Sequence, residues 1–192
     1  MDQPDPVVLR RAQRGDEAAF EVIVRSYRAS VYTYVARVVG DRALAEDLTQ
    51  EIFFRVYQGL PRFGHHSKFT TWLFQVTKNR VLDELRARER RPQAVANVDD
   101  YPFEALELPA DQGETIDAVW RAVHELNSDL KMSLLLRDIV GLSYNEIADS
   151  LEIPLSTVKW RIFKAREDVA IALGREGITF DDRAAVPTPV PA

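Results

Sequence analysis

The chain has 192 residues, 46% of them hydrophobic, and a formal net charge of −5. This length allows one medium domain or two small ones. The absence of cysteine excludes a disulfide framework and a Cys-based zinc site, and three histidines alone argue against a structural metal site. The charged N-terminus lacks the apolar stretch of a signal peptide, and no run approaches 18 apolar residues. We therefore expect a cytoplasmic protein with no metal, no cofactor and no membrane insertion.

Helical periodicity dominates the first part of the chain, and strand signals are scarce. One apolar helix face is marked by Phe20, Val24, Tyr27, Val31, Val35 and Val38. Gly40 is typical of a helix stop, and Asp41 of the N-cap that follows. The expected helices are a short one ending at Gly15 and then 20–38, 42–59 and 70–90. This pattern predicts a helical bundle.

Charge is distributed unevenly along the chain. Residues 93–119 hold seven acids and no base, whereas residues 1–92 hold 16 bases against 12 acids. Such asymmetry indicates two modules joined by a linker. The predicted fold class is all-α, with two small helical domains. The expected organisation is a bundle over 5–92, an acidic linker over 93–115, a second helical domain over 116–173 and a disordered tail over 174–192.

The segment LSYNEIADSLEIPLSTVKWRIFKARE predicts a helix-turn-helix. Ser143 can cap the first helix, with Glu146 at the capping-box position. Glu152 stands in the turn, where many such motifs carry glycine. The expected helices of this half are 116–126, 128–139, 143–151 and 155–173. The side chains expected to face the core are Ile147, Leu151, Val158, Ile162 and Phe163.

Four cations remain for the outer faces of the second helix: Lys159, Arg161, Lys164 and Arg166. They can pair with phosphates and base edges in a DNA groove. The alternative is an ordinary solvated amphipathic helix. The small Ala148, the tight turn and the inward apolar pattern together favour DNA binding.

Two segments of the first half also carry chemistry. In AEDLTQEIFFRVYQ, an acidic face with an aromatic lies opposite Leu48, Ile52 and Val56. The members of this face are Asp47, Gln50, Glu51 and Phe54. It suits a basic protein groove, although an ordinary solvated face is the alternative.

The second segment, FTTWLFQVTKNRVLDELRARERR, interleaves aromatics with cations, which suits single-stranded nucleic acid. The alternative for Trp72, Leu73 and Val76 is bundle core, and we favour that alternative.

Together these three segments resemble the bacterial RNA polymerase sigma factors of the extracytoplasmic-function type within the sigma-70 family. The resemblance covers about residues 5–173. It implies a sigma-2-like domain that reads the −10 promoter element and melts DNA, an acidic linker, and a sigma-4-like domain that reads the −35 element. It also implies core RNA polymerase, promoter DNA and an inhibitory anti-sigma factor as partners.

The same resemblance assigns roles to residues. Docking on the polymerase β′ coiled coil is assigned to Asp47, Gln50, Glu51 and Phe54. Reading the −10 element is assigned to Phe63, His65, His66, Lys68, Trp72, Lys78, Asn79, Arg80 and Arg86. Reading the −35 element is assigned to Ser156, Thr157, Lys159, Trp160, Arg161, Lys164 and Arg166. The apolar helices before the helix-turn-helix would seat the β-subunit flap. Trp160 departs from the small polar residue that is frequent there in the family.

Two other functions remain open from the residues alone. A conventional DNA-binding regulator would have a ligand-sensing or phosphorylated first domain, and an anion-binding structural protein would leave the paired motifs unexplained. The sequence shows no nucleophile–base pair and no phosphate-binding glycine loop, so we expect binding rather than catalysis. The acidic linker suits the cation-lined polymerase channel in which the linker of the family runs, and a disordered spacer is its alternative.

Overall fold

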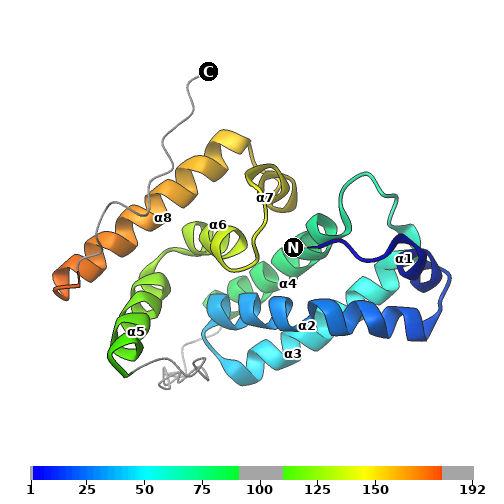
Figure 1. The fold of residues 1–192 in the computed structure, drawn as a ribbon, viewed down its shortest axis with the longest axis horizontal. Helices are drawn as coiled ribbons and strands as arrows, with labels where there is room; N and C mark the ends of the chain where they lie inside the picture. Colours follow the sequence, from blue (N-terminus) through cyan, green and yellow to red (C-terminus); the bar gives the residue numbers. More distant parts are fainter. Residues whose placement is uncertain (1, 91–109, 179–192) are drawn as a thin grey trace.

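The computed structural model describes residues 2–90 and 110–178, with side chains described for 2–90 and 115–178. Most of the expected acidic linker and the tail from residue 179 onward lie outside these described residues. Eight α-helices and one short 3₁₀ helix account for all regular structure in the described ranges, and these ranges contain no strand. The all-α prediction is confirmed (Figure 1).

The first half contains α1 (Pro6–Gln13), α2 (Glu17–Val39), α3 (Arg42–Gly59), the 3₁₀ helix η1 (Leu60–Arg62) and α4 (Phe69–Arg90). The second half contains α5 (Ala110–Glu125), α6 (Ser128–Asp138), α7 (Tyr144–Leu151) and α8 (Leu155–Arg175). Each expected helix is present. The largest difference is α5, which begins at Ala110, six residues before the expected start.

Local capping explains why the long helices begin and end where they do. Gly40 ends α2 with a φ of 71°, in the left-handed region that glycine adopts without strain. The side chain of Asp41 then accepts a hydrogen bond from the backbone N–H of Leu44 and starts α3. The predicted stop and N-cap are both confirmed.

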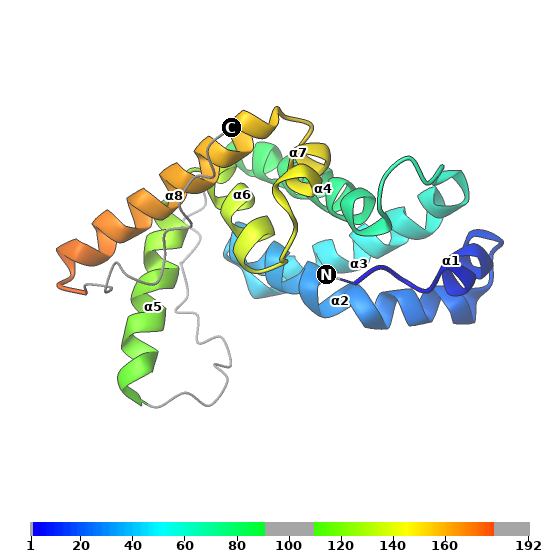
Figure 2. The same cartoon turned by 45° about the horizontal axis from the view of Figure 1, so that its top comes forward.

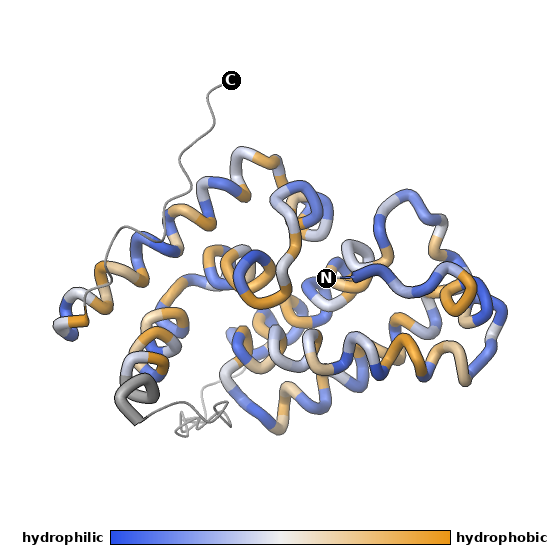
Figure 3. Tube along the Cα trace, in the orientation of Figure 1, coloured by the Kyte–Doolittle hydropathy of each residue, from blue (hydrophilic) through white to orange (hydrophobic). Residues whose placement is uncertain are grey.

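The core of the first half lies between α2, α3 and α4. Val31, Leu48, Ile52 and Phe74 are at most 1% exposed. The rings of Tyr34 and Phe74 meet edge to face, with their centroids 5.7 Å apart. Hydrophobic and hydrophilic residues alternate along these helices, as expected for amphipathic segments around one core (Figure 3).

The second half packs α8 across α5, α6 and α7 (Figure 2). It does not stand apart from the first half. In both ribbon views α7 lies beside α4, and α6 lies beside α2. Buried residues of both halves form one continuous hydrophobic cluster, which runs from Leu9 in α1 to Ala165 in α8, and a small second cluster joins α5 to the end of α8. Within the described part of the chain, no helix is long and apolar enough to cross a membrane.

Candidate nucleic-acid interface

The helix-turn-helix is held by its own capping groups. Ser143 Oγ accepts from the N–H of Glu146 at 3.3 Å, and the Ser143 N–H donates to the Glu146 carboxylate at 2.8 Å. This confirms the predicted capping box. Glu152 ends α7 in the left-handed conformation, with a φ of 58°, and its N–H reaches the carbonyl of Ala148. The tight turn therefore forms with glutamate where glycine is common.

The first half of α8 turns a partly apolar face to solvent. Val158 and Ile162 are buried, as predicted. Phe163 is 67% exposed, so the prediction that it faces the core is wrong. It lies three residues after Trp160, which is 60% exposed, and both therefore share one side of the helix. Ser156 and Lys159 are exposed on the same half of α8, and Thr157 is half-buried.

Acids of the same half hold three of the four cations in the first twelve residues of α8. Arg161 pairs with Asp129 at the start of α6. Lys164 pairs with Glu167 at 2.7 Å and Asp168 at 2.9 Å, and these hydrogen bonds raise its pKa. Arg166 pairs with Asp138 at 2.6 Å. Among the described residues Lys159 has no acidic partner, so the open face of α8 carries one unneutralised cation beside two aromatic rings.

The loop before α4 is built around an aromatic cluster. Phe63 is 7% exposed, and its ring centroid lies 5.1 Å from that of Trp72 and 6.0 Å from that of Phe69. Phe63, which the resemblance assigns to reading the −10 element, is therefore a core residue in this conformation. Trp72 is half-buried and packs against the main cluster, as the favoured alternative predicted.

A glutamine of α1 fixes this loop, and sequence reasoning missed it. The side-chain amide of Gln13 donates to the carbonyls of Leu60 at 3.3 Å and Phe63 at 3.0 Å. Its oxygen lies 3.1 Å from Nε2 of His65, which is exposed with a φ of 56°. His66 is also exposed. An isolated polar residue near the end of a short helix has no pattern that could have revealed this contact.

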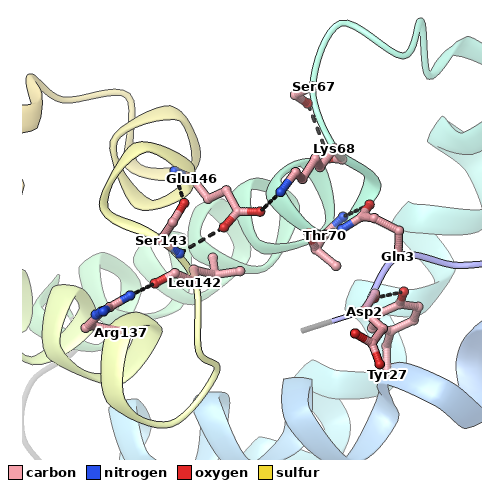
Figure 4. A network of polar contacts seen from close by, with 10 residues as sticks. All are labelled: Asp2, Gln3, Tyr27, Ser67, Lys68, Thr70, Arg137, Leu142, Ser143 and Glu146. Carbon is pink, nitrogen blue, oxygen red and sulfur yellow. Dashed lines mark hydrogen bonds and ion pairs between the residues drawn. The ribbon is translucent and has the colours of Figure 1, made fainter.

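The cations of the α4 region are not equally available. The amine of Lys78 lies 3.1 Å from the Glu152 carboxylate, and its side chain is only 7% exposed. Lys68 reaches Glu146 at 3.0 Å (Figure 4). Arg80 is held by Glu51 and Glu84. Asn79 and Arg86, seven residues apart and therefore on one helix side, are exposed.

The face of α3 that was predicted to dock on a protein groove is exposed to solvent. Leu48, Ile52 and Val56 are at most 1% exposed. The opposite side exposes the four residues expected there: Asp47, Gln50, Glu51 and Phe54. Phe54 is 61% exposed, which is unusual for a large aromatic side chain.

The described residues contain no group of three or more His, Asp or Glu side chains that could hold a metal ion. The exposed charged and aromatic side chains described above are suited to recognition by charge, stacking and apolar contact. Two exposed surfaces on different elements, α3 and α8, are available for it.

Comparison with known proteins agrees with this two-part layout. A family model described as Sigma-70 region 2 matches residues 23–91, and one described as Sigma-70, region 4 matches residues 116–169. The chain is 35% identical over 182 residues to the RNA polymerase sigma-H factor of Pseudomonas aeruginosa, covering 89% of this chain and 94% of that protein. It is 35% identical over 179 residues to the ECF RNA polymerase sigma-E factor of Escherichia coli, covering 86% and 92%.

Two solved structures share the fold at 20% identity. CnrH in complex with the cytosolic domain of CnrY has a TM-score of 0.70 and covers 91% of this chain and 99% of that chain. The sigma factor RpoE of Bartonella quintana in complex with the anti-sigma factor NepR has a TM-score of 0.67 and covers 81% and 96%.

Proposed function

Since this chain belongs to the extracytoplasmic-function branch of the sigma-70 family, we propose that its two halves bind one promoter at two separate elements. It is a sigma factor, which gives core RNA polymerase its promoter specificity. The observation that carries the proposal is the presence of both matched regions, in order, on one helical chain. The protein acts by binding rather than by catalysis, and it works in the cytoplasm, where the polymerase is.

The −35 element is assigned to the front of α8. The geometry that supports this is the capped turn, which leaves Ser156, Lys159 and Trp160 outside the core. A helix presented in this way enters the DNA major groove with its first turns. Further along α8 three cations are paired with acids: Arg161, Lys164 and Arg166. These cations must leave their acidic partners before they can contact DNA phosphates.

The −10 element is assigned to α4 and its preceding loop. Each duplex step that opens gives up about 1.4 kcal/mol of stacking, whereas a base stacked on an aromatic returns roughly 1–3 kcal/mol. Capture of one or two bases near His66, Trp72 and Asn79 therefore offsets the start of melting. The exposed Arg86 lies further along α4, where it can contact the phosphate backbone of the DNA.

The acidic face of α3 is assigned to the β′ coiled coil of the polymerase. Exposed carboxylates around the protruding Phe54 ring match the needs of a basic groove with an apolar pocket. The apolar α5 and α6 are assigned to the β-subunit flap, and the acidic linker to the polymerase channel.

An anti-sigma factor is the proposed inhibitor. The supporting observation is the fold shared with CnrH, solved with the cytosolic domain of CnrY, and with the sigma factor RpoE, solved with the anti-sigma factor NepR. The match extends over 99% of the CnrH chain and 96% of the RpoE chain, so both halves of the fold that occurs in the RpoE–NepR complex are present here.

In vitro transcription tests this function directly. The purified chain is mixed with bacterial core enzyme and a library of random promoters, and start sites are sequenced. We expect a defined pair of elements upstream of the selected starts and permanganate-reactive thymines at −10. Failure of the chain to bind core enzyme would refute the proposal, because a conventional regulator acts without such binding.

A further inference from the structure

One stripe of the α4 region is covered by the helix-turn-helix. The stripe consists of Lys68, Thr71, Gln75 and Lys78, and each of these residues contacts α7 or the turn that follows it. Their spacing of three, four and three residues places them on one side of a helix. This side adjoins the residues we assign to the −10 strand.

Specific polar contacts join the two surfaces. Ser150 Oγ donates to the carbonyl of Thr71 at 3.1 Å, and Ser150 is fully buried. The carboxylate of Glu152 accepts from Gln75 at 3.0 Å and from Lys78 at 3.1 Å. These are contacts between residues more than 70 positions apart in the chain, so they hold the two halves together rather than either half alone.

A third contact uses the capping box itself. Glu146 caps α7 through Ser143 and also receives Lys68 at 3.0 Å (Figure 4). Burial alone would raise the pKa of Glu146, but the hydrogen bonds from Ser143 and Lys68 outweigh burial and lower it. Glu146 therefore stays ionised at neutral pH.

Contacts of two aromatic side chains support the same closure on the other side. The guanidinium carbon of Arg37 in α2 lies 3.3 Å from the ring centroid of Trp120 in α5. The ring of His124 lies so close to Gly40 that a Cβ there would come within 2.7 Å of it. The closed arrangement is thus a packed interface and not a single ion pair.

We infer that the helix-turn-helix half competes intramolecularly with the −10 strand. In the closed form the carboxylates of Glu146 and Glu152 bind Lys68 and Lys78. Once the halves separate, phosphates of the DNA occupy these two positions. The inference rests on the proposed function of α4. Two promoter elements one and a half to two duplex turns apart require sites on the order of 50–70 Å apart, whereas α4 and α7 are in direct contact. The closed form therefore cannot bind both elements, and opening precedes recognition.

Glu152 is the most informative residue to substitute in a test of this closure. Its backbone has a φ of 58°, where an L side chain is strained and glycine is not. Glu152→Gly removes the two contacts that Glu152 makes with Gln75 and Lys78, which weakens the packed interface, and it relieves the local strain, so the variant keeps its fold. The matched control is Asp149→Asn, because Asp149 is an exposed acid of α7 whose carboxylate makes no hydrogen bond or ion pair within the described residues.

Energy transfer on the full chain measures the closure. The chain has no cysteine, so Arg28→Cys on α2 and Ala170→Cys on α8, both exposed, accept one dye each. We expect high transfer in the parent chain and in the Asp149→Asn control. We expect lower transfer in Glu152→Gly, with roughly three- to tenfold tighter binding of a single-stranded −10 oligonucleotide.

The outcomes separate the two proposals. Unchanged transfer and unchanged oligonucleotide affinity in Glu152→Gly would overturn the competition, even if the chain directs transcription. Low transfer in the parent chain would overturn it as well. If transfer falls in Glu152→Gly but neither protein binds the oligonucleotide or directs transcription, the closure stands and the assignment of α4 to the −10 element fails.

Discussion

Trp160 presents an indole on the open side of α8 where three neighbouring cations are already paired with acids. An indole N–H and ring offer less hydrogen-bonding capacity to base edges than an arginine fork, but they offer apolar area. In the major groove the apolar feature is the C5-methyl group of thymine. Trp160, with Phe163 beside it, is therefore expected to favour thymine in the −35 element.

Removal of that methyl group tests the role of Trp160. A promoter with deoxyuridine in place of thymine at the −35 positions should bind about fourfold more weakly, since one buried methyl contributes about 0.8 kcal/mol. The loss should disappear in Trp160→Ser. The measurement is holoenzyme binding to the two promoters by fluorescence anisotropy. An equal loss in both proteins would show that Trp160 does not contact the methyl group.

Tyr34 offers a test of the first core. Its side chain is fully buried, and within the described residues its hydroxyl has no hydrogen-bond partner. Burial raises the pKa of this phenol well above its usual range. Tyr34→Phe keeps the ring against Phe74 and removes the unsatisfied group, so unfolding should become harder by up to about 1 kcal/mol. Chemical denaturation measures this, and a loss of more than 1 kcal/mol would show that the hydroxyl is bonded.

At the scale of a helix, one face of α3 is buried in the core, and the exposed face is the one we propose for polymerase docking. Phe54→Ala removes a ring that is 61% exposed, so stability should change little. Affinity for core polymerase should fall about tenfold, as for a central aromatic of an interface. Ile52→Ala is the matched control: the residue is fully buried, and its truncation should cost about 2–5 kcal/mol of stability. Weaker polymerase binding without unfolding is the result expected for Phe54 alone.

Helix positions were predictable because their signals are local. Gly40, Asp41 and the Ser143–Glu146 pair act on neighbouring backbone groups, and the structure confirms each of them. Phe163 was not predictable from spacing alone. It follows Ile162 directly, and the helical period does not decide which of two adjacent apolar residues lies nearer the core; the structure buries Ile162.

The contact between the halves lay beyond sequence reasoning for a related reason. Lys78 and Glu152 are a charged pair of the kind that usually remains solvated, and nothing in either local pattern indicates that they meet. The same holds for Gln13, whose amide binds the loop before α4. Long-range polar contacts of this kind depend on the packing of whole elements, so the surfaces of α3 and α8 were predictable but their availability was not.

At the scale of the whole molecule, the closed contact between the two halves contains ionisable groups that respond differently to pH. Hydrogen bonds from Lys78 lower the pKa of Glu152, and the pKa of Glu146 is also lowered. A carboxyl whose pKa is lowered in the closed form stabilises that form above its ordinary pKa. These two contributions therefore persist above about pH 5 and fade only in stronger acid.

His124 behaves differently, because its pKa is lowered by burial first and then by Lys131 and Arg37. The open form, with His124 hydrated, binds a proton more readily. The closed form is consequently favoured above the ordinary histidine pKa of about 6.5 and loses stability as pH falls through it. His124 is nevertheless an exposed residue in the closed form, so the effect is a partial shift rather than complete opening.

Acidification from pH 8 to pH 5.5 should therefore lower energy transfer between the two halves of the labelled chain. In His124→Gln the same titration should be nearly flat, because the replacement is neutral over this range while the carboxylates stay ionised. The variant His66→Gln is the control, since that histidine lies in the loop before α4 and is exposed. It should keep the parent profile. Identical pH profiles for the parent and His124→Gln would mean that the pH dependence of closure comes from groups other than this imidazole. A rise in energy transfer on acidification would contradict the direction argued from the lowered pKa of His124.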